Sequence, residues 1–170
     1  IQGRSSGPFD SWILDYVFLH KNRNETDISF PDRALTLSNS RPFEKYSAIP
    51  LFILQKDQDT FWNTTSNEFK NLDNSFRAME YTIEIREKAN QNVVKTINSN
   101  TPFNPVPVGQ ERRTFASNTI SNVPLPDEEM DYELISYLVT GDGLLNGVEN
   151  GIPITYPEVD FRINDTVRTT

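Results

Sequence analysis

The chain has 170 residues, a net charge of −8 and no cysteine, a length that can bury one ordinary core or two small ones. The acidic balance disfavours nucleic acid and anionic lipid as partners, and the missing cysteines exclude disulfides, thiolate zinc sites and cysteine nucleophiles. With 11% aromatic residues and a mean hydropathy of −0.55, the composition suits a thin two-layer β module, with a core rich in rings, better than a large α/β enzyme core.

The first predicted strand covers residues 12–19, which are apolar on both faces except for Asp15. Such a run is typical of a strand buried on both sides. We expect it to close the sheet of an upstream domain, and we assign residues 1–20 to that domain.

Residues 21–59 form a predicted connector between two domains. Turn signals dominate this segment, which predicts one helical turn near 42–47 and an extended stretch after it that is interrupted by Pro50. The residues from 43 to 54 are too apolar for a free tether. We therefore expect the connector to pack across a neighbouring sheet.

Residues 79–86 carry the clearest periodicity in the chain. Apolar residues at every odd position alternate with polar residues at every even position, namely Met79, Tyr81, Ile83 and Ile85 against Glu80, Thr82, Glu84 and Arg86. This two-residue repeat predicts a half-buried strand over 78–87. A turn at Gln91-Asn92 and a second apolar run at 93–97 complete a predicted hairpin.

Further short strands are predicted on either side of this hairpin. They lie around 69–72, near 112–117, at 132–139 and at 159–167, while the glycines between 140 and 151 indicate a turn. The sequence thus predicts an all-β fold class, with an immunoglobulin/fibronectin-III-like sandwich over 60–170 that is preceded by the closing strand of a jelly-roll and the packed connector. The cysteine-tryptophan-cysteine pattern of antibody domains is absent.

Catalytic chemistry finds little support in the sequence. His20 is the single histidine and is best explained as a surface or strand-end residue. There is no Gly-x-Ser-x-Gly motif and no phosphate-binding loop. We therefore expect no enzyme activity, no catalytic residue and no cofactor.

The densest acidic cluster comprises Asp127, Glu128, Glu129, Asp131 and Glu133. Oxygen ligands at this spacing would fit weak calcium binding, but the Asp-x-Asp-x-Asp-Gly order of a calcium loop is missing. A solvated acidic turn before a strand is the favoured interpretation, and no metal ligand is assigned.

Three aromatic residues are the candidate contacts for a ligand or a partner. Phe61 and Trp62, with Tyr46, Phe52 and Phe69 nearby, would form an aromatic platform for sugar rings or for a protein surface. In the alternative and favoured interpretation, these rings fill the junction between the N-terminal region and the sandwich.

A family resemblance rests on short strand motifs. The sequence SGPFDSWILDYVFL at 6–19 resembles the closing strand of jelly-roll, carbohydrate-binding-type domains. Together with the strands after 71–74 and FRINDTV at 161–167, it makes the chain similar to large multi-domain secreted proteins of bacteria with type IX secretion. The resemblance implies strings of β-sandwiches at the cell surface and transfers no catalytic residue.

The predicted function is binding to other molecules, without catalysis. We expect a non-catalytic β-sandwich portion of a larger extracytoplasmic bacterial protein, acting in cell-surface assembly, adhesion or type IX secretion-associated complexes. Its partners would be proteins of such an assembly or a glycan, at the cell surface, secreted or associated with the outer membrane, without direct membrane insertion. The alternative is a carbohydrate-binding module of a secreted glycan-processing protein.

The chain opens without Met and closes directly after a strand-like run, so we expect both ends to be cuts through a longer polypeptide.

Overall fold

The computed structural model describes residues 24–26, 33–43, 45–46, 48–128, 130–139, 146–149, 152–155 and 166–169. The predicted strand at 12–19 and His20 lie outside these residues, so the prediction of an upstream jelly-roll strand is not tested. None of the helices in the described ranges is long and apolar enough to cross a membrane.

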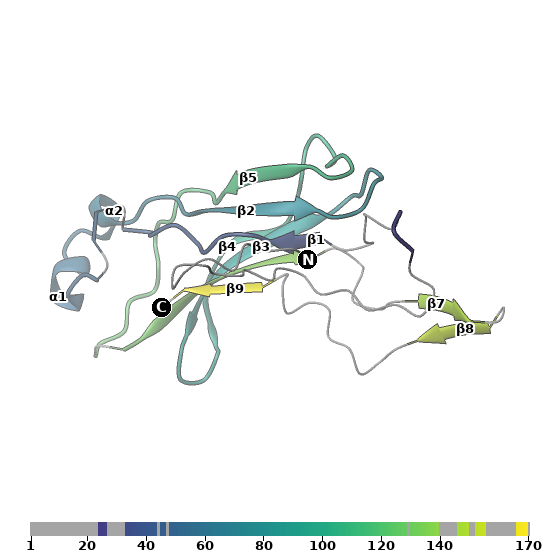
Figure 1. Cartoon of the computed structure of the whole chain (residues 1–170). Helices are drawn as coiled ribbons and strands as arrows, with labels where there is room; N and C mark the ends of the chain where they lie inside the picture. Colours follow the sequence, from purple (N-terminus) through teal and green to yellow (C-terminus); the bar gives the residue numbers. More distant parts are fainter. Residues whose placement is uncertain are drawn as a thin grey trace, which may run out of the picture.

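Antiparallel strands dominate the described chain, which confirms the prediction of a mostly β fold (Figure 1). Sheet A has the order β1-β2-β5 and sheet B the order β4-β3-β6-β9, while β7 and β8 form a separate hairpin. The bounds in sheet A are Arg33–Leu35 for β1, Ser66–Asn71 for β2 and Arg112–Ala116 for β5. Those in sheet B are Glu80–Glu87 for β3, Val93–Pro102 for β4, Tyr132–Val139 for β6 and Thr166–Thr169 for β9. The hairpin consists of Asn146–Glu149 and Ile152–Thr155.

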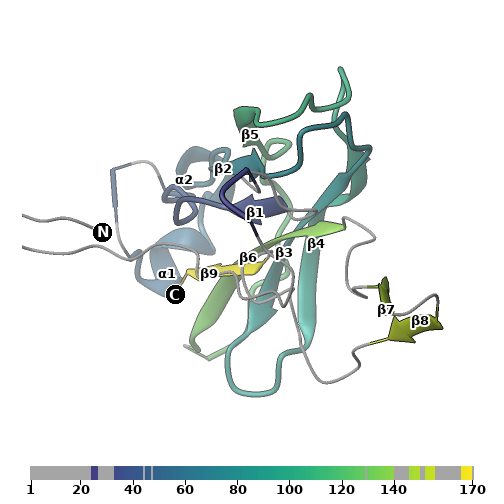
Figure 2. The same ribbon diagram turned by 45° about the vertical axis from the view of Figure 1, so that its right-hand side comes forward.

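The core lies between sheets A and B, which form two layers in Figures 1 and 2. The odd-numbered residues of the predicted alternation are all buried, as expected, and β6 pairs with β3 so that Leu134 and Leu138 join the same face. Sheet A contributes Phe69 and Phe115. Rings supply much of this core, since Phe69, Tyr81, Phe103 and Phe115 contact one another with centroids 4.5 to 6.3 Å apart.

The other face of β3 is more buried than the alternation predicts. Thr82 and Glu84 are buried, and so is Ile135 of β6, the residue that pairs with Glu84. The carboxylate of Glu84 accepts hydrogen bonds from the Arg86 guanidinium at 2.7 and 2.9 Å, which offsets part of the cost of burying the charge. This strand is therefore buried on both faces over its central residues.

The helices are short and lie where the sequence predicted an extended stretch. Helix α1 spans Leu51–Leu54 and α2 spans Gln58–Phe61, whereas residues 42, 43 and 45 form turns without a helix. The extended-segment prediction was thus wrong. Pro50 has the fixed φ that suits a helix start, and the Asp57 carboxylate accepts a hydrogen bond from the Thr60 N–H, as an N-cap does.

The other strand predictions have mixed outcomes. The β3–β4 hairpin and the strands β5 and β6 confirm the predicted elements. The prediction of a turn over 140–151 was wrong for β7, a strand that pairs with β8. Strand β1 lies within the predicted connector and pairs with β2, so sheet A draws a strand from residues 21–59.

Candidate functional site

The two helices form one end of the molecule, which we call the helix end (Figure 1). Hydrogen bonds attach them to the segment before β6. The Gln55 side-chain amide donates to the Pro126 carbonyl at 3.0 Å, and the Val123 N–H donates to the Gln58 Oε1 at 2.8 Å. Val123 is itself a core residue. The helix end is therefore joined to the core rather than suspended from it.

The three predicted contact residues lie at this end in two ring pairs. The Tyr46 and Phe61 rings meet edge to face with centroids 6.3 Å apart, and the Phe43 and Trp62 rings are tilted with centroids 4.5 Å apart. Trp62 also packs against the hydrophobic core, and its Nε1 is buried without a hydrogen-bond partner in the described residues. The Trp62 ring is therefore partly occupied by protein contacts, whereas 53% of Tyr46 is exposed.

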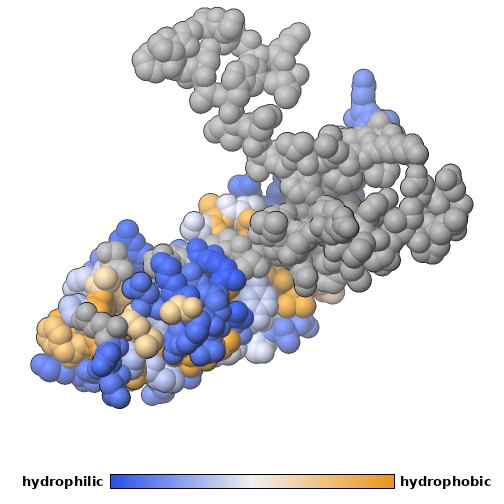
Figure 3. Space-filling view, turned by 90° about the horizontal axis from the view of Figure 1, so that it is seen from below, coloured by the Kyte–Doolittle hydropathy of each residue, from blue (hydrophilic) through white to orange (hydrophobic). Residues whose placement is uncertain are grey.

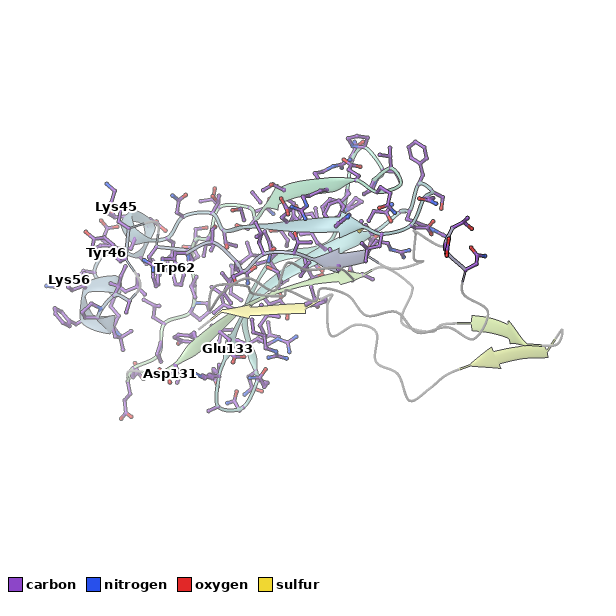
Figure 4. The ribbon with its side chains drawn as sticks, viewed as in Figure 1. Lys45, Tyr46, Lys56, Trp62, Asp131 and Glu133 are labelled. Carbon is purple, nitrogen blue, oxygen red and sulfur yellow. The ribbon has the colours of Figure 1, made fainter. Side chains whose placement is uncertain are left out.

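Of the two further rings that the sequence predicts near this platform, Phe69 is fully buried in the core and Phe52 is exposed. Phe52 lies on α1 and is 60% exposed. Lys45 and Lys56 are exposed beside these rings (Figure 4), and Figure 3 shows hydrophobic surface at the same end. We call Lys45, Tyr46, Phe52 and Lys56 the helix-end surface.

The acidic cluster divides into two parts. Asp127, Glu128 and Asp131 are exposed before β6, whereas Glu133 lies within β6 and accepts hydrogen bonds from Gln91 and Arg168 at 3.1 and 3.0 Å. The pKa of the Glu133 carboxyl is lowered, first by the hydrogen bond from Gln91 and also by Arg168. Partial desolvation acts in the opposite direction but does not cancel these two effects.

No group of three or more metal-ligating side chains occurs within the ranges that the structure describes. Glu129 lies outside those ranges. Weak calcium binding by the cluster stays a prediction.

Comparison of the chain with protein families, with curated proteins and with solved structures found no match.

Proposed function

We propose that the chain is a non-catalytic β-sandwich module of a larger extracytoplasmic bacterial protein, and that it acts by contact in cell-surface assembly, adhesion or type IX secretion-associated complexes. The observation that carries this proposal is the helix-end surface, where Tyr46 and Phe52 expose their rings on a scaffold attached to the core. Aromatic rings provide a large contact area at a low cost in side-chain entropy, and Lys45 and Lys56 supply a polar rim.

The strand order supports the immunoglobulin/fibronectin-III-like part of the proposal. An immunoglobulin constant-type domain has strands A, B, E and D in one sheet and C, F and G in the other. If β1, β2 and β5 take the places of A, B and E, then β3, β6 and β9 take those of C, F and G. The fourth strand, β4, differs because it pairs with β3 in sheet B. The jelly-roll strand at 1–20 and the connector at 21–59 belong to the same proposal.

Affinity purification of the intact protein from its native cells tests the proposal. We expect proteins of the cell surface or of the secretion machinery to co-purify, and we expect Tyr46→Asp with Phe52→Asp to lower their recovery about tenfold, as loss of ~1.4 kcal/mol of contact energy would. Leu37→Asp is the matched control, because Leu37 is similarly exposed but follows β1 in sheet A. Equal recovery with all variants, or recovery of cytoplasmic proteins alone, would contradict the proposal.

Glycan binding is the alternative from another class. The contacts of Trp62 with Phe43 and the core count against this ring as a sugar platform, so Tyr46 is the better candidate for stacking. A glycan array on which binding is lost with Tyr46→Ala would favour this alternative over protein contact.

A further inference from the structure

A second group of exposed apolar residues lies in loops at the end of the molecule opposite the helices, and Figure 1 shows where these loops lie. The loops that join β2 to β3 and β4 to β5 meet there, and the Arg77 N–H donates to the Pro107 carbonyl at 3.1 Å. Next to these two residues are Phe76, which is 69% exposed, and the exposed Val106 and Val108. We call Phe76, Val106 and Val108 the loop-end patch.

Buried hydrogen bonds fix the two loops that carry this patch. Asn71 is fully buried, and its side-chain amide donates to the carbonyls of Ser75 and Val108 at 3.0 and 2.9 Å. A third link runs from the Gln110 N–H to the Asp73 carbonyl at 2.8 Å. Since the loops are already ordered, an apolar partner would bind the patch with little loss of conformational entropy.

In two of the three ion pairs near this patch the arginine is the more exposed member, whereas Arg113 and Glu111 are about equally exposed. In the Arg77–Asp73 pair, with 2.8 Å between Nε and Oδ2, the arginine is 48% exposed and the carboxylate 15%. The Arg112–Glu68 pair has the same asymmetry. The rim of the patch therefore exposes the guanidinium groups of Arg77 and Arg112, in a chain whose net charge is −8.

The complementary surface lies at the other end of the same molecule. Before β6, the exposed residues Asp127, Glu128 and Asp131 flank Met130 in the sequence, and Met130 is itself 44% exposed. Asp131 lies towards the helix end in Figure 4, and the register of β6 against β3 places this segment at the end of β3 far from the loop-end patch. We call Asp127, Glu128, Met130 and Asp131 the acidic turn. Its flexible methionine suits an irregular apolar surface.

We propose that the loop-end patch of one copy binds the acidic turn of a second copy. Met130 would contact Phe76 and the two valines, while the carboxylates would face the guanidinium rim. Because the two surfaces are different and lie at opposite ends, the contact is head to tail and leaves one free surface at each end of every assembly. This self-association goes beyond the proposed function, since it uses other residues than the helix-end surface and requires no other protein.

Sedimentation of the purified chain tests this contact at protein concentrations up to about 1 mM, where interactions with millimolar dissociation constants become populated. We expect the average mass of the wild type to rise above the 19.5 kDa of the monomer. Phe76→Asp replaces the apolar ring of the loop-end patch with a charge, and Asp127→Lys with Glu128→Lys reverses the charge of the acidic turn. Each variant alone should therefore stay monomeric. Leu37→Asp should associate like the wild type.

An equimolar mixture of the two variants gives the sharpest result. Each variant keeps one intact surface, so the mixture should form a dimer of twice 19.5 kDa and nothing larger. All the substituted side chains are exposed, so unchanged unfolding midpoints should show that the variants fold. A wild type that stays monomeric, a variant that associates like the wild type, or a mixture that stays monomeric would overturn the proposal. The recovery of surface proteins with Tyr46→Asp and Phe52→Asp tests only the proposed function, and its outcome does not affect this self-association.

Discussion

At the scale of single residues, two buried amides join the two layers of the described chain. Asn67 in β2 faces the core, and its side-chain amide donates to the Asn39 Oδ1 at 2.7 Å. The Asn39 amide then donates to the Leu134 carbonyl of β6 at 3.0 Å. Each of these two side-chain amides donates to an acceptor. The two hydrogen bonds therefore link sheets A and B and leave neither amide unsatisfied.

Gly109 has no room for a side chain. A Cβ at this position would lie 2.1 Å from the Asn74 carbonyl oxygen, so the backbone of one loop would have to move. We expect Gly109→Ala to lower the free energy of unfolding by about 1–3 kcal/mol, as overpacking does. Urea denaturation measures this change. Ser99→Ala, at an exposed position of β4, should have little effect, and equal stability of the two variants would show that the loops are not in close contact.

At the scale of elements, β9 is attached to sheet B by its backbone and by one polar cluster. Arg168 in β9 donates both to Gln91, in the turn before β4, and to Glu133 in β6. The pKa of Glu133 is lowered below its ordinary value of about 4.5. A carboxyl whose pKa is lower in the folded state stabilises the fold above the unfolded pKa, and this contribution disappears as the pH falls through the folded pKa.

Glu133→Gln should therefore make the free energy of unfolding depend less on pH in the acidic range. We expect the wild type to lose more of its stability than the variant between about pH 6 and pH 3, because only the wild type gives up a favourable carboxylate. Thermal unfolding at a series of pH values measures the difference. Glu128→Gln, in the exposed acidic turn, is the control. Parallel profiles for Glu133→Gln and the wild type would show that the cluster contributes nothing.

The elements with long, regular patterns could be predicted from the sequence, and the short ones could not. The repeat at 79–85 locates the core face of β3 because burial on one face imposes period two. Strand β1 has three residues and helix α1 has four, too few for any period to appear. Ile120 and Val123 enter the core from a segment outside the strands, where no repeat exists to reveal them.

The candidate site was predictable only in part, for a related reason. A ring that binds a partner and a ring that fills the core have the same composition signal, so Tyr46 and Trp62 looked alike in the sequence. The structure separates them by packing, since Trp62 contacts the core and Tyr46 remains more than half exposed.

At the scale of the whole molecule, two sheets enclose one core rich in rings, and several of the apolar residues that are left outside lie at its two ends. Tyr81 is central to this arrangement, because its ring lies 4.6 Å from that of Phe115 and its hydroxyl donates to the Ala116 carbonyl at 3.2 Å. Both contacts run from sheet B to sheet A. Burial accordingly raises the pKa of the Tyr81 hydroxyl.

Proton–proton contacts between the Tyr81 and Phe115 rings, measured by nuclear Overhauser spectroscopy, test the two-layer account most directly. With ring centroids 4.6 Å apart, we expect clear cross-peaks between these two rings. Cross-peaks from Tyr81 to residues of sheet B alone would mean that the layers do not close over a shared core, and would contradict the account.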